Sequence, residues 1–200
     1  MKNLFFIQIG SNDGKTNDPI HEFIKGYNWK GILVEPVEYL FNRLLTTYAG
    51  CAEMRFENLA INARKGTRRF YQLKATTDPD VPSWSSLLGS FRKSVVLKNI
   101  GSAPGLKKYL FSEKVNCISF KSLLRKHGVT KIDFLHIDTE GYDYEVIKSI
   151  PFRELKPQLI LFEHLHLTRT EYDKCIRLLH RNHYSVTDLN NGYDSIASLG

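Results

Sequence analysis

The stretch Ile-Asp-Phe-Leu-His-Ile-Asp-Thr-Glu-Gly-Tyr-Asp, residues 132–143, decides the fold. Its first half is short and apolar, which predicts a buried strand over residues 132–138. Gly141 then permits a tight turn, and a helix is predicted over residues 144–150, limited by Pro151. An apolar strand that ends in acidic residues and turns at once into a helix is typical of α/β sheets.

The same alternation extends along the chain on both sides of this stretch. Further strands are predicted over residues 4–10, 31–36, 56–61, 69–73, 115–120, 158–163, 184–188 and 195–198. Helices are predicted from Asp18-Pro19 to about Gly26, and over residues 39–45, 120–127 and 170–181. The pattern predicts a mostly parallel sheet with helices on both faces, closed by an antiparallel pair. A hairpin-like turn is expected at Lys65-Gly66, between the strands over 56–61 and 69–73.

Residues 75–114 interrupt this pattern with prolines, glycines and polar residues that surround aromatic side chains. A structureless loop of this length is uncommon in a compact domain, and such segments often serve as lids or binding loops. We therefore expect one domain over residues 1–200, with a partly ordered substrate lid or insertion at about 75–114. Trp84 and Tyr109 are candidates to stack on a substrate.

Composition leaves several classes of partner open. The chain has 200 residues, with 28 basic and 21 acidic residues and a net charge of +7, but the basic residues are scattered. That charge fits nucleic acid, an anionic substrate or a membrane surface equally well. The 3 cysteines form no CxxC pair, so reduced thiols are expected. No apolar run is long enough to span a membrane and the first residues lack a signal-peptide pattern, so the expectation is a soluble, cytoplasmic protein.

Two predicted strand ends favour an adenosine-containing cofactor. Gly10-Ser-Asn-Asp-Gly14 follows the first strand, where a glycine turn and a helix N-terminus direct N–H groups at an anionic group. Glu35 ends the second strand, 21 positions after Gly14. An acidic residue at this place is suited to accept hydrogen bonds from two ribose hydroxyls.

Two further strand ends carry the candidates for chemistry. Asp138 ends the strand over 132–138, where a carboxylate can face a cationic cofactor group, a metal or a substrate hydroxyl. Glu163 and His164 end the strand over 158–163 at the same predicted edge, with His166 beyond. Histidine is the side chain best suited to accept a proton near neutral pH. By contrast, His136 inside its strand and Asp143 at a helix N-terminus are expected to be structural.

Taken together, these residues resemble the FkbM-type family of S-adenosylmethionine-dependent methyltransferases. The similarity covers nearly the whole chain and rests on residues 6–14, 31–36, 58–62 with Gly66 and Phe70, 132–143 and 159–164. The Ile-Asp-x-Glu-Gly core at 137–141 is its most specific part. The sequence departs from many members at Gln8, Ser11 and His136, where Asp, Ala and Lys, respectively, occur.

The resemblance implies a class I methyltransferase fold, a Rossmann-like three-layer sandwich with a mostly parallel seven-stranded sheet and an antiparallel final strand. It implies S-adenosyl-L-methionine as cofactor, with the methionine part wrapped by Gly10, Ser11, Asn12, Asp13 and Gly14. By the same resemblance Glu35 holds the ribose, Ala60 and Ile61 lie near the adenine, and Asp138 lies by the amino group and the sulfonium. The family is associated mainly with O-methylation of hydroxyls on sugars and natural products.

A neutral hydroxyl is a poor nucleophile, so methyl transfer to it calls for a base or a metal. The candidate base is His164 or Asp138, with Glu163 beside them. The alternative is a divalent metal, Mg²⁺ or Mn²⁺, held by Asp138, Glu163 and His164. The expected acceptor is a small molecule or glycan, and an anionic acceptor is among those allowed.

Three other readings stay open. A nucleic-acid methyltransferase fits the charge of +7, but Asp138-Thr-Glu-Gly lacks the proline motif typical of base amino methylation. A nicotinamide-dependent enzyme is disfavoured because the chain lacks GxGxxG. A non-catalytic module that only binds the cofactor is the third reading. The oligomeric state is left open.

Overall fold

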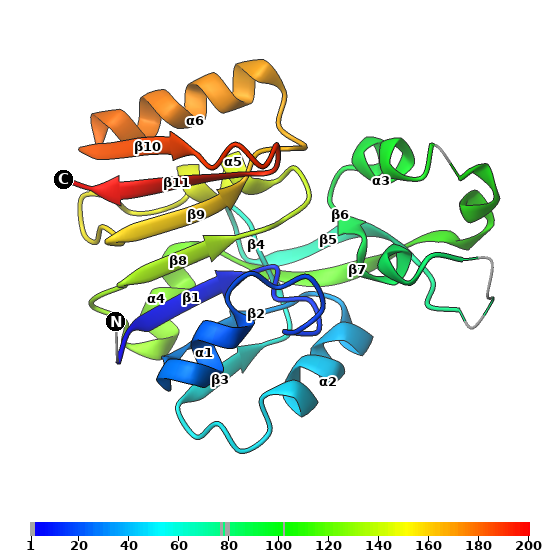
Figure 1. The fold of residues 1–200 in the computed structure, drawn as a ribbon, viewed down its shortest axis with the longest axis horizontal. Helices are drawn as coiled ribbons and strands as arrows, with labels where there is room; N and C mark the ends of the chain where they lie inside the picture. The colour runs from blue at the N-terminus through cyan, green and yellow to red at the C-terminus, as the bar shows by residue number, and fades with distance from the viewer. Residues whose placement is uncertain (1–2, 77, 79–80, 102) are drawn as a thin grey trace.

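The computed structural model describes residues 3–76, 78, 81–101 and 103–200. Its main sheet has the order β10-β11-β9-β8-β1-β2-β3 (Figure 1). The strands are β1 (Phe5–Ile9), β2 (Lys30–Val34), β3 (Met54–Glu57), β8 (Phe134–Ile137), β9 (Leu159–Glu163), β10 (Tyr184–Asp188) and β11 (Asp194–Leu199). Strand β11 runs antiparallel to both β9 and β10, whereas the other pairs are parallel. The predicted mostly parallel, seven-stranded sheet with an antiparallel final strand is confirmed.

Helices cover both faces of this sheet, in three layers. They are α1 (His21–Tyr27), α2 (Glu38–Thr47), α4 (Phe120–His127), α5 (Asp143–Lys148) and α6 (Arg169–Arg181). Ile24 of α1 packs in a buried cluster with Phe6 and Phe134. Residues of α4, α5 and α6 pack in a second cluster with Ile7 and Leu135, the strand neighbours of Phe6 and Phe134. Since neighbouring strand residues face opposite sides, α1 lies on one face and α4 to α6 on the other. In the described part of the chain, none of the helices is both long and apolar enough to cross a membrane.

Two helices have clear end signals, and one begins later than predicted. Ser119 caps α4 and Gly128 ends it in the left-handed conformation, so the predicted bounds of 120–127 are confirmed. Helix α6 begins with a capping box between Thr168 and Glu171. The prediction that α1 starts at Asp18-Pro19 is wrong, because the Asp18 carboxylate accepts a hydrogen bond from the Ile20 N–H and holds a turn before the helix.

A second sheet branches from the main one, in the order β4-β7-β5-β6. Its strands are β4 (Ala60–Ile61), β5 (Gly66–Leu73), β6 (Gly89–Ser90) and β7 (Leu110–Ile118). The predicted single strand over 56–61 is therefore wrong: Glu57 pairs with Val34 in the main sheet, whereas Ala60 pairs with Cys117 in the second. The expected hairpin at Lys65-Gly66 is also wrong, because β5 pairs with β7 instead.

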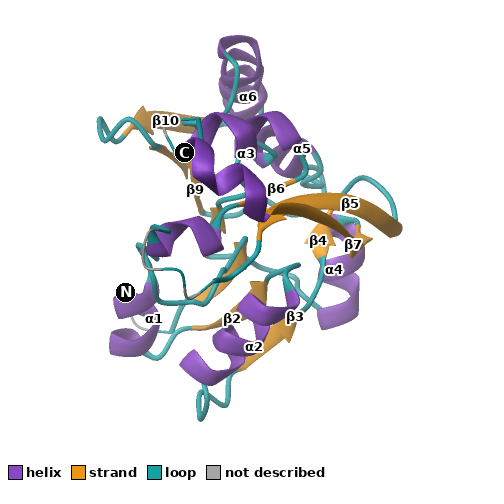
Figure 2. Cartoon of the chain, turned by 90° about the vertical axis from the view of Figure 1, so that its right-hand side faces the viewer, coloured by secondary structure: helices purple, strands orange, loops and turns teal. Residues whose placement is uncertain are grey.

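Much of the 75–114 segment has regular structure. It contains the 3₁₀ helices η1 (Ser83–Leu87) and η2 (Pro104–Tyr109), strand β6, α3 (Lys93–Asn99) and the start of β7. Leu88, Val96, Ile100 and Leu106 pack with Leu73 of β5 in an apolar cluster of their own. The segment projects from the main sheet on β5 and β7 (Figures 1 and 2). This cluster, together with Phe91, which packs in the main core, explains why the segment is ordered.

Candidate functional site

Gly10, after β1, is fixed by close approach to the end of β8. Its φ is +85°, and a Cβ at this position would lie 1.7 Å from the carbonyl oxygen of Asp138. The N–H groups of Gly10 and Ser11 both donate to the carbonyl oxygen of Val34, at 3.0 Å each. The turn therefore joins the ends of β1, β2 and β8, which is where parallel sheets bind ligands.

Only part of the predicted glycine turn faces a cavity. Gly10 and Asn12 line it, whereas the lining does not include Ser11, Asp13 or Gly14. The Ser11 hydroxyl donates to the Gln8 carbonyl oxygen at 3.2 Å and accepts from the Val34 N–H. At Gly14, a Cβ would lie 2.5 Å from Leu44. These contacts shape the turn.

Asp13 also acts within the turn. Its carboxylate accepts hydrogen bonds from the N–H groups of Lys15 and Thr16 and forms an ion pair with Arg43 at 2.9 Å. Burial raises the pKa of Asp13, but the hydrogen bonds from Thr16 and Lys15 outweigh it, so the net effect is a lowered pKa. The charged Asp13 carboxylate therefore stabilises the loop through these contacts.

Glu35 lies at the end of β2 with its carboxylate in the same cavity as Gly10. The side chain is buried, with Oε2 accepting from the Asn12 N–H and Oε1 from the Val37 N–H, both at 2.9 Å. Burial raises the pKa of Glu35 to about 7. Each carboxylate oxygen has two lone pairs, so each keeps one for a further hydroxyl donor.

Apolar side chains form the wall of this cavity beside Glu35. Val37, Leu40, Ala60 and Ile61 line it, as the flat ring of a nucleobase requires. The cavity has about 40 Å³ of free volume, far below the ~300–1,000 Å³ of most ligand sites. Leu87 and Leu88 help to close it, and the Tyr39 hydroxyl donates to the Ser86 carbonyl oxygen beside them.

A second cavity of about 570 Å³, which we call the acidic cleft, adjoins the first. The two share Asn12, Leu87, Leu88, Asp138 and Glu140 in their linings. Four carboxylates line the acidic cleft: Asp138, Glu140, Glu163 and Asp194. Among the residues that the structure describes, its lining includes no lysine or arginine. The cleft is thus locally negative in a chain whose net charge is +7.

Asp138 stands where the two cavities meet. Its backbone N–H donates to the Ile9 carbonyl oxygen at 2.9 Å, which continues the pairing of β8 with β1. Its carboxylate has no hydrogen-bond partner within the described ranges of the chain. Burial, followed by repulsion from Glu140 and Asp143, raises the pKa of Asp138 well above its usual range. Asp138 is therefore disposed to accept a proton or to face a positive group.

The structure separates Glu163 from His164, which the sequence analysis placed in one site. Leu161 packs on the α1 face of the sheet and Phe162 on the opposite face, so the alternation puts Glu163 on the α1 face and His164 on the other. His164 Nδ1 lies 3.0 Å from the Ser195 hydroxyl and its ring packs on Tyr172 of α6. The lining of the acidic cleft does not include His164.

His166 takes the position that the sequence analysis gave to His164. The Leu167 N–H donates to the His164 carbonyl oxygen in a turn after β9, and His166 lines the acidic cleft with Glu163. Its Nε2 atom lies 3.0 Å from Glu140 Oε2 and 3.9 Å from Glu163 Oε1. Glu140 and His166 were not among the predicted site residues, although both stand within three positions of residues that were.

His136, which also borders the acidic cleft, and Asp143 both make buried polar contacts within the fold. His136 is buried with its Nδ1 atom 3.0 Å from Gln8 Nε2, and burial lowers its pKa to about 4. Asp143 accepts hydrogen bonds from the N–H groups of Thr139 and Gly141, at 3.1 Å each. It closes the turn that carries Asp138 and Glu140 to the cleft.

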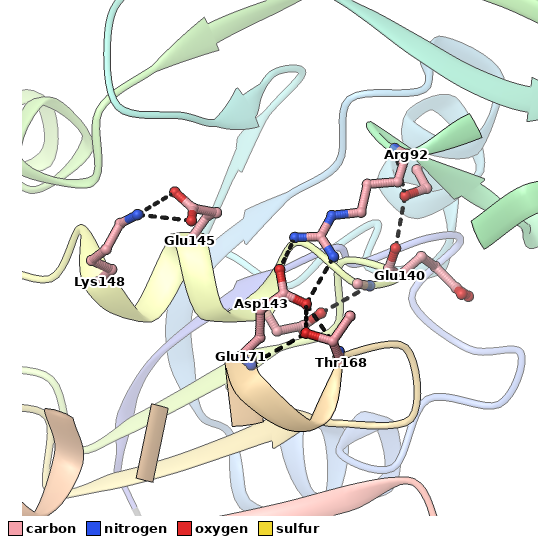
Figure 3. A network of polar contacts seen from close by, with 9 residues as sticks. Arg92, Glu140, Asp143, Glu145, Lys148, Thr168 and Glu171 are labelled. Carbon is pink, nitrogen blue, oxygen red and sulfur yellow. Dashed lines mark hydrogen bonds and ion pairs between the residues drawn. The ribbon is translucent and has the colours of Figure 1, made fainter. Parts of the chain in front are cut away.

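Polar contacts tie the inserted segment to this turn and to α6. The Ser90 hydroxyl of β6 donates to the Glu140 carbonyl oxygen at 2.7 Å. Figure 3 shows the guanidinium of Arg92 directed at Glu171 of α6, beside Thr168. Asn99 of α3 brings its Nδ2 atom to 3.3 Å from His166 Nε2. The segment therefore borders the acidic cleft and is joined to Glu140 and His166, which lie at the floor of the cleft.

Comparison with known proteins identifies the family and relatives that share the fold. Residues 8–186 match the sequence profile of the Methyltransferase FkbM domain. The structure of an FkbM methyltransferase from Methylobacillus flagellatus KT is similar at a TM-score of 0.57 and 11% identity, over 98% of this chain and 43% of that one. The present chain therefore spans less than half the length of that relative.

Two other solved structures share the fold. Fibrillarin from Aeropyrum pernix, solved with natively bound S-adenosyl-L-methionine, aligns at a TM-score of 0.52 and 13% identity, over 99% of this chain and 67% of its own. The METTL16 methyltransferase domain aligns at a TM-score of 0.50 and 10% identity, over 100% of this chain and 61% of its own. A search of curated proteins found no match. Since the FkbM domain profile covers most of the sequence, the chain belongs to the FkbM methyltransferase family.

Proposed function

We propose that this chain binds S-adenosyl-L-methionine across its two joined cavities and directs methyl transfer to a hydroxyl group in the acidic cleft. The buried carboxylate of Glu35 is the observation that carries the proposal. It is held by two backbone N–H groups in a cavity that Gly10 and Asp138 also line. Fibrillarin, which shares the fold, was solved with this cofactor bound.

The residues present suit the parts of that cofactor. Glu35 has acceptor capacity left for the two ribose hydroxyls, and Ala60 and Ile61 offer an apolar wall to the adenine. The unpaired carboxylate of Asp138 is suited to the positive amino group and sulfonium. The narrow volume beside Glu35 means that Leu87 and Leu88 have to withdraw when a nucleoside binds.

When bound, the cofactor supplies a methyl group on a positively charged sulfur, which is already a good leaving group. The task of the protein is to align the acceptor oxygen, to exclude water and to take the proton that this oxygen loses. Asp138 is the proposed proton acceptor, because it borders both cavities and its carboxylate lies free of hydrogen-bond partners among the described residues. His164 lacks that access, since it contacts Ser195 and Tyr172 instead.

The lining of the acidic cleft favours a neutral acceptor, such as a hydroxyl of a sugar, a glycan or a natural product. Four carboxylates and no described lysine or arginine line it, so the anionic acceptor allowed by the sequence analysis is disfavoured. The phosphates of a nucleic acid would be repelled in the same way. Trp84 and Tyr193 are 41% and 54% exposed in the lining and offer ring faces for stacking. Tyr109 does not line the cleft, since its hydroxyl donates to Asp78.

The segment over residues 75–114 is the proposed lid of the acidic cleft, within a single domain over residues 1–200. It contributes Trp84, Leu87, Leu88 and Asn99 to the cleft and is fastened through Arg92 to α6. A lid that closes over the acceptor excludes water from the transfer step.

Calorimetry with S-adenosylhomocysteine tests the proposal directly. We expect binding to the unmodified chain and a loss of about tenfold or more in affinity for Glu35→Gln, because a charge-assisted hydrogen bond to ribose is removed. Glu38→Gln is the matched control, since Glu38 is exposed three positions away at the start of α2. Equal affinity of all three proteins, or no heat with any, would contradict the proposal.

A screen for the acceptor completes the test. Mass spectrometry of mixtures with S-adenosylmethionine and a panel of sugars and phenols reports the added methyl group on its acceptor. Neutral sugars are expected to react in preference to their uronic acids. Cofactor binding without turnover on any candidate would favour the non-catalytic module.

A further inference from the structure

Three side chains at the floor of the acidic cleft converge on one point. Glu140 follows β8, Glu163 ends β9 and His166 lies in the turn after β9. One possible ligand atom from each lies within 4.8 Å of those of the other two. The closest pair is His166 Nε2 and Glu140 Oε2 at 3.0 Å, and His166 Nε2 lies 3.9 Å from Glu163 Oε1.

These separations suit donors that share one ion. Bonds of about 2.1 Å from a metal place neighbouring donors about 3.0 Å apart and opposite donors about 4.2 Å apart in an octahedral site. The distances of 3.0 and 3.9 Å from His166 Nε2 fall in this range. Small side-chain rotations therefore suffice to bring all three donors onto one ion.

The polar atoms of this cluster are incompletely satisfied. Glu163 Oε2 is buried and has no hydrogen-bond partner among the described residues, and the same holds for His166 Nδ1. The side chains of Glu163 and His166 are only 11% and 5% exposed. A buried polar atom without a partner costs free energy, so a carboxylate left this way indicates a missing positive partner.

The surroundings supply negative charge and no compensating basic side chain. Asp138 and Asp194 line the same cleft, whose described lining lacks lysine and arginine. Four carboxylates thus share one cleft, where like charges repel and the Glu163 carboxylate, only 11% exposed, is desolvated. A bound cation relieves both the repulsion and the desolvation.

We propose that Glu140, Glu163 and His166 together bind one divalent transition-metal ion at the floor of the acidic cleft. A site with one imidazole and two carboxylates favours ions such as Mn²⁺ or Zn²⁺ over Mg²⁺, which prefers oxygen donors only. This set differs from the alternative metal set of Asp138, Glu163 and His164 named from the sequence, because His164 lies on the opposite face of the sheet.

Asn99 links the ion site to the inserted segment. Its amide Nδ2 atom lies 3.3 Å from His166 Nε2 and 3.5 Å from Glu140 Oε2. Rotation of the amide by half a turn directs the oxygen to the same place, which adds a fourth donor from α3. An ion there lies in the same cleft as Asp138 and lowers the pKa of a coordinated hydroxyl; this consequence rests on the proposed function, whereas the binding does not.

Electron paramagnetic resonance with Mn²⁺ tests the site, because bound Mn²⁺ loses the six-line signal of the free ion. The protein carries no polyhistidine tag and is held near pH 7.5. We expect about one Mn²⁺ per chain, and at least tenfold weaker binding for Glu163→Gln and for His166→Gln. His180→Gln is the matched control, since His180 is exposed on α6.

Thermal unfolding provides the second measurement, since an ion that binds only the folded chain raises its melting temperature. Mn²⁺ is expected to raise it in the unmodified chain and in His180→Gln but not in Glu163→Gln. If Glu163→Gln does not fold, Glu140→Gln takes its place, because its side chain is 24% exposed.

No Mn²⁺ binding by the folded, unmodified chain would overturn the proposal and leave a simple ion pair between His166 and Glu140. Equal binding by the variants and the control would overturn it as well. S-adenosylhomocysteine calorimetry on the same samples keeps this outcome separate from a failure of the proposed function.

Discussion

The carboxylate of Glu171 in α6 accepts hydrogen bonds from the guanidinium of Arg92, which stands 79 positions earlier at the start of α3. Both side chains are largely buried, at 20% and 27% exposed. Glu171 also closes the capping box with Thr168. One carboxylate thus fixes both the first turn of α6 and the base of the inserted segment.

The Arg92–Glu171 pair predicts a specific loss of stability in acid. The hydrogen bond from Arg92 is the main cause that lowers the pKa of Glu171 from 4.5 to about 2. A lowered folded-state pKa stabilises the fold above pH 4.5, and this contribution is lost as the pH falls toward 2. Urea unfolding between pH 7 and pH 3 should show a shallower loss of stability for Glu171→Gln than for the unmodified chain.

Asp173→Asn is the control for that series, because Asp173 pairs with Arg169 near the surface of the same helix. Its acid profile should follow the unmodified chain. Parallel profiles for Glu171→Gln and the unmodified chain would show that the pair contributes nothing to acid stability.

Glu35 predicts a pH-dependent affinity for adenosine. Burial raises the pKa of Glu35 to about 7, so the carboxylate is mostly protonated at pH 6 and mostly ionised at pH 8. The ionised form is the stronger hydrogen-bond acceptor, so affinity should rise with pH, by up to about tenfold over this range. Adenosine is the suitable probe because it has no titrating group there. Glu35→Gln should bind weakly with a flat profile, and a flat profile in the unmodified chain would contradict the assignment.

Substitution of Gly10 should create a steric clash, and the same substitution at Gly50 separates the cost of this clash from the cost of backbone strain. Gly10 and Gly50 both have φ of +85°, but a Cβ at Gly10 would lie 1.7 Å from the Asp138 carbonyl oxygen, whereas Gly50 has no atom within 4 Å. Gly50→Ala should lose about 1–2 kcal/mol of unfolding free energy from backbone strain. Gly10→Ala should lose about 3 kcal/mol more, or fail to fold, because the backbone of β8 has to move. Equal losses of unfolding free energy for the two variants, measured in urea, would mean that the protein relieves the clash at Gly10 without an energetic cost.

Asp138 and His164 predict opposite outcomes in turnover. Asp138→Asn should lower the rate by about 10²–10⁴-fold, the usual effect of losing a general base. His164→Gln should keep most of its turnover, because the ring contacts Tyr172 and Ser195 outside the cleft lining. The rates are measured with the acceptor from the mass-spectrometric screen. A large loss in His164→Gln alone would restore the assignment from the sequence.

The sequence predicts the main sheet well because its strands are short apolar runs ended by glycine, proline or acidic residues. It fails at residues 56–61, where both pieces are strands but belong to different sheets. Pairing partners far along the chain decide that split, and local pattern contains no information on them. In the inserted segment, Val95, Val96 and Ile100 do mark one face of α3, but the surrounding prolines and glycines hide it.

The candidate site is predicted in part for a similar reason. Gly10, Glu35 and Asp138 lie around one cavity because parallel strands end at one edge, and the proposal that they bind the cofactor stays a prediction. The choice between His164 and His166 depends on which face each side chain takes after β9 ends. Alternation along β9 already puts Glu163 and His164 on opposite faces, so that signal was present in the sequence. The sequence pattern does not show the turn after β9 that places His166 at the cleft.

The two points where the second sheet joins the framework lie next to each other, since Ala60 pairs with Cys117 and Ile61 with Ile118. The chain between Ile61 and Cys117 therefore leaves the rest of the protein and returns to it at adjacent positions. Replacement of this portion therefore leaves Glu35 and Asp138, which lie outside it, in the chain. A chimaera spliced at these two positions should acquire the acceptor preference of its donor, and its cofactor affinity should change as well, because Leu87, Leu88 and Phe91 of this portion line the cavity beside Glu35.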